Sequence, residues 1–328
     1  MPPKKPVSKI TGKTRLQQQG RFLARGLPGA VAAAYPGFID PMLPELRTVV
    51  PAGEKWLFEL KLDGYRAQAH LVDGNATVFT RRGFDWSGKF EPVTIETAAL
   101  PARSVILDGE LVAIDPDGRV NFSALEADLG AGRMDRLVFY AFDLLYHDGV
   151  DLRGVLLIER KKALAELLDE AGCHRILYTE HFESAGAQLF EKVCGMQMEG
   201  IVCKQKQSKY ASGRTDIWLK VKCTKRDDFP VIGYIPDAGG GIAALYVGKW
   251  EGETLRYAGK VGTGFSGKTG RQLRKSLEKI RAIVSPVDGL DKPKASWVEP
   301  FIRARVQYND ITDDGLLRHA SFICVGNC

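Results

Sequence analysis

The last third of the chain constrains the fold most, because five short apolar segments there surround a single helical segment. The helix, about Thr269–Ile283, falls between the third and the fourth expected strand. A small Greek-key barrel of the OB type combines five strands with one helix in this position. The pattern therefore predicts an OB barrel, with strands at Val231–Ile235, Ala243–Trp250, Leu255–Val261, Ile302–Asn309 and Ser321–Val325.

The preceding residues have a different pattern, in which short apolar or alternating segments mix irregularly with helical ones. Helical spacing of apolar residues is found in Leu156–Ala171 and Ala185–Met196. Such a mixture is typical of an α+β domain with antiparallel sheets rather than of a regular βα repeat. The expected strands are Trp56–Leu60, Ala67–Leu71, Ala76–Thr80, Val105–Ile114 and Leu137–Leu145. We predict domains at residues 36–225 and 226–328, linked by the charged stretch Lys222–Asp228, after an arm at residues 1–35.

The composition excludes several classes of protein. With 45% apolar and 26% charged residues the chain is typical of soluble globular proteins, and no apolar run approaches the roughly 20 residues that span a bilayer. Six scattered cysteines without a Cys-x-x-Cys pair argue against a disulfide framework and a structural zinc site, and favour a reducing cytoplasm. Residues 1–25 contain seven lysines and arginines and no acidic residue. This arm suits a phosphate backbone, although a solvated tail is an equally good interpretation.

The strongest local motif is Lys-Leu-Asp-Gly-Tyr-Arg, which begins at Lys61. A lysine at the end of an apolar strand, beside an Asp-Gly turn, can present its amine in a cleft. The amine is a nucleophile only in its neutral form, which burial or neighbouring positive charge favours. Taken alone, Lys-x-Asp-Gly is also a common surface hairpin sequence.

Four later motifs add acidic, aromatic and paired basic side chains. They are Asp108-Gly109-Glu110, Phe139-Tyr140-Ala141-Phe142-Asp143-Leu144-Leu145, Glu199-Gly200-Ile201-Val202-Cys203-Lys204 and Trp218-Leu219-Lys220-Val221-Lys222. In an extended strand Lys220 and Lys222 project from the same face. Two neighbouring ammonium groups suit a polyphosphate ligand.

In this order the motifs resemble those of the covalent nucleotidyltransferases, and specifically those of the ATP-dependent DNA ligases. Phe38-Ile39-Asp40-Pro41 and Leu317-Arg318-His319-Ala320-Ser321-Phe322 further resemble the ligase module of bacterial end-joining ligases. The resemblance covers about residues 36–322. It implies an α+β adenylation (nucleotidyltransferase) domain with antiparallel sheets, followed by an OB-fold domain. It also implies ATP-dependent sealing of 5′-phosphate/3′-hydroxyl breaks in duplex DNA, in DNA repair, recombination or end joining.

The resemblance implies roles for the matching residues. Lys61 would attack the α-phosphate of ATP and carry AMP. The nucleotide-binding residues would be Glu59, Arg66, Arg81, Glu110, Phe142, Lys220 and Lys222, and those near Mg²⁺ (or Mn²⁺) would be Glu110 and Glu199. The expected DNA contacts are Arg82, Lys268 and Arg318. The expected partners are nicked or broken duplex DNA and end-joining proteins. The protein is expected to be a cytoplasmic, DNA-associated monomer that does not bind a membrane.

A competing motif lies at residues 262–269, where Gly-Thr-Gly-Phe-Ser-Gly-Lys-Thr satisfies the Walker A pattern. A P-loop domain needs several βα units and a later strand that ends in a metal-binding aspartate. The residues after Thr269 instead resemble β-structure. We therefore expect these glycines to shape the turn between the third barrel strand and the helix.

The C-terminal segment departs from the family pattern. Related ligases continue into Arg-x-Asp-Lys, whereas this sequence has Gly326 at the position of the arginine. The departure puts self-adenylation in doubt more than the sealing of an already adenylated nick. The alternatives to a DNA ligase are an RNA ligase, a GTP-using capping enzyme, a P-loop ATPase or a non-catalytic DNA-end binder with a decayed site.

Overall fold

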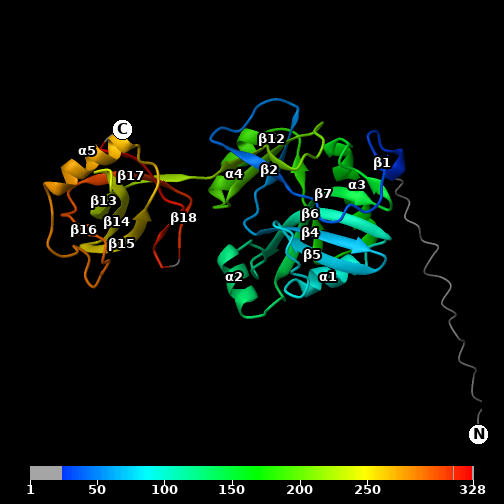
Figure 1. The fold of residues 1–328 in the computed structure, drawn as a ribbon, viewed down its shortest axis with the longest axis horizontal. Coiled ribbons are helices and arrows are strands. Elements are labelled where there is room, and N and C mark those ends of the chain that lie inside the picture. The colour runs from blue at the N-terminus through cyan, green and yellow to red at the C-terminus, as the bar shows by residue number, and fades with distance from the viewer. Residues whose placement is uncertain (1–23, 313, 327–328) are drawn as a thin grey trace, which may run out of the picture. The chain divides into compact units, whose positions relative to one another are not determined.

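The computed structural model describes residues 24–312 and 314–326, which fall into two compact units. The first unit is Met1–Lys222 and the second is Cys223–Cys328, as the ribbon in Figure 1 shows. The basic residues of the predicted arm up to Arg21 lie outside the described residues. The rest of the predicted arm belongs to the first unit, because the short 3-10 helix Ala24–Gly26 is followed by β1 (Val31–Ala32), which pairs with a later strand.

A seven-stranded sheet forms one half of the first unit. Its order is β1-β8-β7-β6-β4-β5, with β9 paired to β7. Three helices contribute to the apolar core on one of its faces: α1 (Glu91–Ala98), α2 (Phe122–Gly130) and α3 (Leu157–Ala171). The strands are β4 (Tyr65–Val72), β5 (Asn75–Thr80), β6 (Ser104–Ala113), β7 (Leu137–His147), β8 (Val150–Asp151) and β9 (Ile176–Tyr178).

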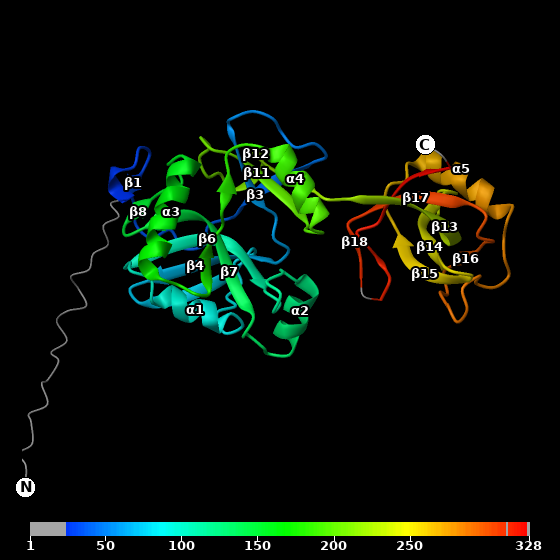
Figure 2. The ribbon, with the colours of Figure 1, turned by 180° about the vertical axis from the view of Figure 1, so that it is seen from behind.

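A five-stranded sheet of order β10-β3-β11-β12-β2 forms the other half. A second apolar core joins it to the first sheet and contains Leu57, Ile106 and Trp218 from three different strands. Helix α4 (Gly186–Gly195) packs against β11 of this sheet, and Figure 2 shows it beside β11 and β12. The strands are β2 (Met42–Arg47), β3 (Trp56–Leu60), β10 (His181–Phe182), β11 (Gly200–Gln205) and β12 (Gly213–Lys222).

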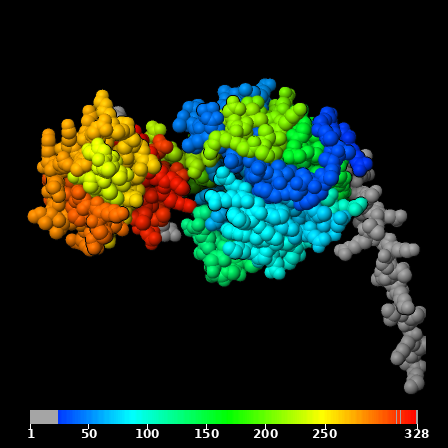
Figure 3. Space-filling model, in the orientation of Figure 1, coloured from blue at the N-terminus to red at the C-terminus, as the bar shows by residue number. Residues whose placement is uncertain are grey.

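The chain before β3 crosses the outside of the first unit. Figure 3 shows it as blue atoms that lie against the cyan strands of the seven-stranded sheet. Polar contacts tie it down, since Gln68 Nε2 donates to Ile39 O at 2.6 Å and Tyr210 Oη accepts from Met42 N at 3.0 Å. The first contact ties the residues before β2 to β4, and the second ties β2 to the loop between β11 and β12.

The predicted α+β class with mainly antiparallel sheets is confirmed for the first unit. All five strands expected there are present, and so are the two helices expected at Leu156–Ala171 and Ala185–Met196. Two strand pairs are parallel, β12 with β2 and β7 with β9. Helices α1 and α2 were not expected. Each helix buries only two of its residues, so its sequence shows no clear helical spacing of apolar residues.

The second unit has the strands and the helix expected of an OB barrel. The sheet order is β15-β14-β13-β17-β20, with the short β16 paired to β13. Helix α5 (Gly267–Glu278) lies between β15 and β17 in sequence and buries Leu273 and Leu277 in the barrel core. The strands are β13 (Lys225–Pro236), β14 (Ile242–Glu251), β15 (Thr254–Val261), β16 (Ser296–Trp297), β17 (Arg303–Tyr308) and β20 (Ser321–Val325), with a hairpin of β18 (Asp310–Ile311) and β19 (Leu317–Arg318).

The predicted linker is shorter than expected. Lys225–Asp228 pair with β17 as the first residues of β13, so Cys223 and Thr224 alone lie between β12 and β13. Asp228 is held there by Arg305, whose Nη2 lies 2.8 Å from its carboxylate. Charge along the sequence indicated exposure, but it did not reveal that the exposed residues form a strand.

The Walker-like segment forms the turn that closes the barrel. Phe322 N of β20 donates to Thr263 O at 2.9 Å, and the rings of Phe265 and Phe322 stack with centroids 4.8 Å apart. Gly264 has φ +92°, and a Cβ atom there would lie 2.1 Å from Phe322 O. The glycine therefore serves a left-handed turn and a close backbone contact, as expected.

The cysteines differ from the expectation. Cys194, Cys223 and Cys324 are disulfide-bonded, whereas Cys173 and Cys203 are free. Spacing along a sequence does not tell which thiols the fold brings within bonding distance. No helix among the described residues is long and apolar enough to cross a membrane.

Candidate active site

Lys61 follows β3 directly and is held by both its backbone and its side chain. Its N–H donates to Gly200 O at 2.9 Å. Its Nζ lies 2.6 Å from Glu199 Oε2, and the other oxygen of Glu199 lies 2.9 Å from Lys222 Nζ. Burial alone would raise the pKa of Glu199, but Lys61 and Lys222 outweigh burial and lower it. One carboxylate thus connects the lysines of two sequence motifs.

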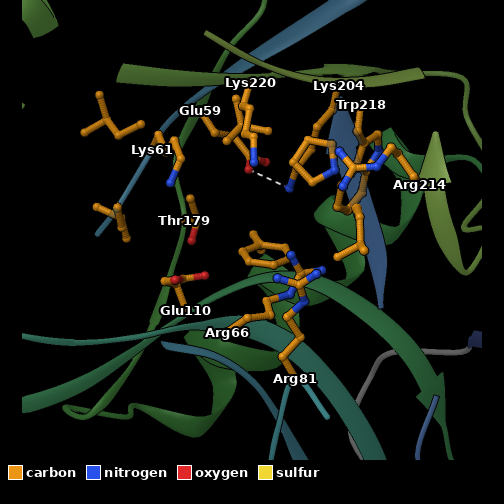
Figure 4. Close-up of a pocket in the computed structure, with 16 residues that line it drawn as sticks. Glu59, Lys61, Arg66, Arg81, Glu110, Thr179, Lys204, Arg214, Trp218 and Lys220 are labelled. Carbon is orange, nitrogen blue, oxygen red and sulfur yellow. Dashed lines mark ion pairs between the residues drawn. The ribbon is translucent and has the colours of Figure 1, made fainter. Parts of the chain in front are cut away.

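A cavity of about 230 Å³ lies beside Lys61, between the two sheets of the first unit. Figure 4 shows Lys61, Glu59, Lys204 and Lys220 on one side of it and Glu110, Arg66 and Arg81 on the other. The first group follows or belongs to strands of the five-stranded sheet. The second belongs to β4 and β6 of the seven-stranded sheet or directly follows β5. Other described wall residues include Thr179, Val202, Arg214, Trp218 and Phe142.

Arg66 is fixed by a buried carboxylate. Its Nε and Nη2 each lie 2.6 Å from one oxygen of Asp108, which also accepts from Tyr210 Oη at 2.6 Å. Burial opposes the charge of Arg66, but Asp108 outweighs burial and raises the pKa of Arg66. The guanidinium carbon lies 4.3 Å from the centre of the Phe142 ring. A fixed cation therefore lies against the aromatic wall of the cavity.

Glu110 lies opposite the lysines, and burial raises its pKa to about 7, although Arg66 and Lys61 act in the other direction. A carboxylate that is desolvated to this degree favours a cation or a hydrogen-bond donor as its partner. Lys220 and Arg214 add positive charge to the other wall. Burial, then Lys61 and Lys222, lower the pKa of Lys220. The repulsion among these cations suits an anionic ligand.

Glu59 is buried beneath the cavity between two lysines. Its oxygens lie 2.7 Å from Lys161 Nζ and 2.6 Å from Lys204 Nζ. Burial alone would raise its pKa, but the two ammonium groups lower it. Burial lowers the pKa of Lys204 to about 8, and its Nζ lies 4.0 Å from the Phe142 ring centre and 4.2 Å from that of Trp218.

The residue that follows Phe142, Asp143, makes another buried ion pair. Arg160 Nε and Nη2 lie 2.6 and 2.8 Å from the oxygens of Asp143, and both side chains are fully buried. Arg160 Nη1 also donates to Val155 O at 2.6 Å. The pair anchors β7 to α3 directly behind the aromatic wall.

The structure brings most of the expected site residues together, but not all. Among the described residues that border the cavity are Lys61, Glu59, Arg66, Arg81, Glu110, Phe142 and Lys220. Glu199 and Lys222 are not among them: Glu199 contacts Lys61, and Lys222 contacts Glu199. Arg82 is exposed next to Arg81, and it is not a wall residue. Lys268 and Arg318 belong to the second unit, at the start of α5 and in β19.

Several residues of the site were missed from the sequence. They are Asp108, Lys161, Arg160, Thr179, Lys204, Arg214 and Trp218. Asp108, Lys204 and Trp218 lie inside the recognised motifs, so the motifs themselves could have pointed to these three residues. Arg160 and Lys161 lie on α3 at positions that helical spacing buries, and a buried charge in an apolar period is itself a signal.

Two family profiles match the chain. The profile described as "ATP dependent DNA ligase domain" matches residues 41–222, and "ATP dependent DNA ligase C terminal region" matches residues 238–325. The multifunctional non-homologous end joining protein LigD of Pseudomonas aeruginosa is 34% identical over 97% of this chain and 40% of its own length. DNA ligase B of Mycobacterium tuberculosis is 31% identical over 83% of this chain and 59% of its own length. This chain thus spans about two fifths of the end-joining relative.

Solved structures agree with these matches. The ligase domain of M. tuberculosis LigD has a TM-score of 0.53 and 29% identity, over 87% of this chain and 94% of that one. A mycobacterial DNA ligase D solved with ATP and MES has a TM-score of 0.52 and 30% identity over the same shares. A Lig E DNA ligase, at 22% identity and a TM-score of 0.61, supports the fold, including the OB barrel. These matches favour a DNA ligase over an RNA ligase or a capping enzyme, and the chain belongs to the family of ATP-dependent DNA ligases.

Proposed function

We propose that this chain seals 5′-phosphate/3′-hydroxyl breaks in duplex DNA, with AMP carried on Lys61 Nζ. The observation that carries the proposal is the placement of Lys61. Its amine lies at the edge of a cavity with one aromatic wall and several cations, 2.6 Å from the carboxylate of Glu199. A nucleotide needs an apolar surface for its base and positive charge for its phosphates, and the cavity offers both.

Lys61 first has to lose a proton, because an ammonium group is not a nucleophile. Glu199 Oε2 is the carboxylate atom closest to this proton. The nitrogen then attacks the α-phosphate of ATP, a P–N bond forms, and the bond to pyrophosphate breaks. Lys220 and Lys222 stabilise the negative charge on the transferred phosphate. AMP next moves to the 5′-phosphate of the DNA, and the 3′-hydroxyl displaces it.

We assign the adenosine half of the nucleotide to the part of the cavity that has the aromatic wall. We assign stacking on the base to Phe142, and contact with the base edge to Glu59. Arg66, Arg81 and Glu110 surround the space left for the ribose. The ion pair with Asp108 keeps the guanidinium of Arg66 in one plane, so Arg66 needs little reordering when the ligand binds.

The carboxylates suit Mg²⁺ or Mn²⁺. Within the described residues no three His, Cys, Asp or Glu side chains cluster, but Mg²⁺ is commonly held by one or two carboxylates with phosphate and water. Glu110 and Glu199 are the residues that we expect to hold it, because Glu110 borders the cavity with a desolvated carboxylate and Glu199 lies beside Lys61. The bound ion would neutralise charge on the phosphates.

DNA contacts involve both units in this proposal. We assign contacts with the DNA backbone to Arg82, Lys268 and Arg318. Residues 36–225 form the adenylation domain in this proposal, and residues 226–328 form the OB domain. The basic residues at 1–25 add positive charge that suits duplex DNA. The names of the relatives support a role in end joining. Our proposal adds partner proteins of end joining, and a monomer that works on DNA in the cytoplasm.

The test uses ATP labelled at the α-phosphate, followed by a denaturing gel. We expect label on the wild type and none on Lys61→Ala or Lys61→Arg. Lys55→Ala is the matched control, since Lys55 is an exposed lysine on the same segment, over the Trp56 ring. A nicked duplex that already carries AMP tests the later steps separately. The proposal fails if the wild type neither takes up label nor seals this duplex, or if Lys61→Ala retains the label.

A further inference from the structure

The second unit contains a groove of about 880 Å³, which none of the described residues assigned to DNA sealing borders. Its described walls are the hairpin of β14 and β15, residues 286–290, and residues 311 and 314–316. Leu255 and Val287 in these walls belong to a small apolar cluster that is separate from the barrel core. A cavity of this size, with an apolar lining and a few polar groups, is typical of a binding site.

Each wall of the groove is held by hydrogen bonds of its own. Strands β14 and β15 pair up to the two-residue turn 252–253. In the second wall Ser285 Oγ donates to Val287 O at 2.9 Å. In the third wall Leu316 N donates to Thr312 Oγ1 at 3.1 Å. The groove is therefore preformed, and a partner that binds there has little of the chain to order.

Trp250 gives the groove a large aromatic side chain that is 46% exposed. Leu255 lies opposite it in the register of β14 and β15. Lys292 Nζ lies 5.5 Å from the ring centre of Tyr257, the second aromatic residue of the walls, so this face already attracts an ammonium group. Exposed apolar side chains in a groove mark interaction sites, and tryptophan is among the residues that contribute most to protein interfaces.

Carboxylates dominate the charge around the groove. Of the charged side chains in its described walls four are acidic and two are basic, and all are exposed. One of the basic side chains is already paired, because Arg256 Nε lies 3.2 Å from Glu251 Oε2. The acidic residues are Glu251, Glu253, Asp288 and Asp314, and the basic ones are Lys249 and Arg256. The groove therefore suits a cationic partner.

This charge argues against DNA and against a metal ion as the occupant. Phosphates in the groove would meet carboxylates that repel them. The exposed cations Lys268, Arg271 and Lys275 belong to α5 and do not border the groove. Figures 1 and 2 show α5 on the upper side of the second unit and β15 on the lower side. Within the described residues no three His, Cys, Asp or Glu side chains are placed to hold a metal ion.

We propose that the groove binds a segment of a partner protein in which lysine or arginine lies next to a large apolar side chain. The apolar side chain packs against Leu255 and Val287 beside Trp250, and the cation faces Glu253 and Asp288. The inference goes beyond the proposed function and does not rest on it, because it concerns which protein the chain meets and not the sealing reaction.

The test selects peptides from a phage-displayed library of short random sequences on the immobilised full chain, and then measures their Kd in solution. We expect the selected peptides to combine lysine or arginine with tryptophan, leucine or another large apolar residue. Trp250→Ala should weaken their binding at least about tenfold. Glu253→Lys should also weaken it, by repulsion, and it replaces Trp250→Ala if that variant does not fold. The matched controls are Phe301→Ala and Glu299→Lys, at exposed positions of the second unit outside the groove.

The inference is overturned if no peptide is selected, if the selected peptides have no excess of basic residues, or if they bind both variants as tightly as the wild type. It is also overturned if Trp250→Ala weakens binding to nicked duplex DNA as much as it weakens peptide binding, because the groove then belongs to the DNA-binding surface. A wild type that dimerises in sedimentation while Trp250→Ala stays monomeric would assign the groove to a second copy of the chain instead. Label on Lys61 should stay at the wild-type level in both variants, and a wild type without label would overturn the proposed function alone.

Discussion

Replacing Arg160 by methionine should destabilise the first unit strongly. Arg160 and Asp143 are fully buried and meet through two contacts of 2.6 and 2.8 Å. The variant leaves the carboxylate of Asp143 buried without its cation, which costs about 3–5 kcal/mol. At about 2–4 °C per kcal/mol for a unit of this size, the melting temperature should fall by about 6–20 °C.

An exposed pair of the same kind supplies the comparison. Arg153 meets Asp151 through three contacts of 2.6 to 3.1 Å, but the side chain of Arg153 is 37% exposed. Arg153→Met should cost at most about 1 kcal/mol, because water replaces the lost partner. Two ion pairs with similar contacts but different burial should thus lose different amounts of unfolding free energy.

Differential scanning calorimetry measures both variants under the same conditions. The double variant Asp143→Asn/Arg160→Met should recover much of the loss, since it removes the uncompensated charge. The reasoning is refuted if Arg160→Met and Arg153→Met lower the melting temperature equally. It is also refuted if the double variant is less stable than Arg160→Met.

Three further predictions concern charge, backbone and DNA. The pKa of Glu110 is about 7 in the folded chain, against an ordinary value of 4.5, so its contribution to stability is present below about pH 4.5 and is lost as the pH rises to about 7. The free energy of unfolding of Glu110→Gln, measured in urea relative to the wild type, should therefore rise by up to about 3 kcal/mol between pH 4.5 and pH 8, and an equal difference at both pH values would contradict this. Gly200 has φ +143° and a Cβ there would lie 2.1 Å from Val221 O, so Gly200→Ala should cost at least about 2 kcal/mol in urea unfolding, against little for Gly88→Ala, where a Cβ meets nothing within 4 Å. The affinity for nicked DNA should fall more than about tenfold between 50 and 200 mM salt, with a shallower slope after deletion of residues 1–25, and an unchanged slope would exclude a DNA contact by that segment.

The sequence predicted the elements whose apolar pattern is long. Strands β6, β7 and β14 each bury a nearly continuous run of residues and helix α3 buries residues at helical spacing, and each was expected close to its observed bounds. Helices α1 and α2 gave no comparable signal because they bury few side chains. The linker was misplaced because Lys225–Asp228 are charged yet lie in a strand.

The cavity walls could be predicted where a motif names the residue that faces the ligand. Lys61, Arg66 and Glu110 lie in such motifs and border the cavity. The residues that hold them could not be found in the same way. Lys161 acts on Glu59 from 102 positions away in the chain (161 − 59), and only the packing of α3 on the sheets reveals the contact.

Arg160 and Lys161 have a consequence for how the cavity can deform. Arg160 binds Asp143 of β7, in the seven-stranded sheet, whereas Lys161 binds Glu59 of β3, in the five-stranded sheet. Consecutive Cα atoms are about 3.8 Å apart, so one peptide unit of α3 spans the join between the two sheets. The two ion pairs therefore tie both walls to one helix, so a change in the width of the cavity would have to stretch or break one of them.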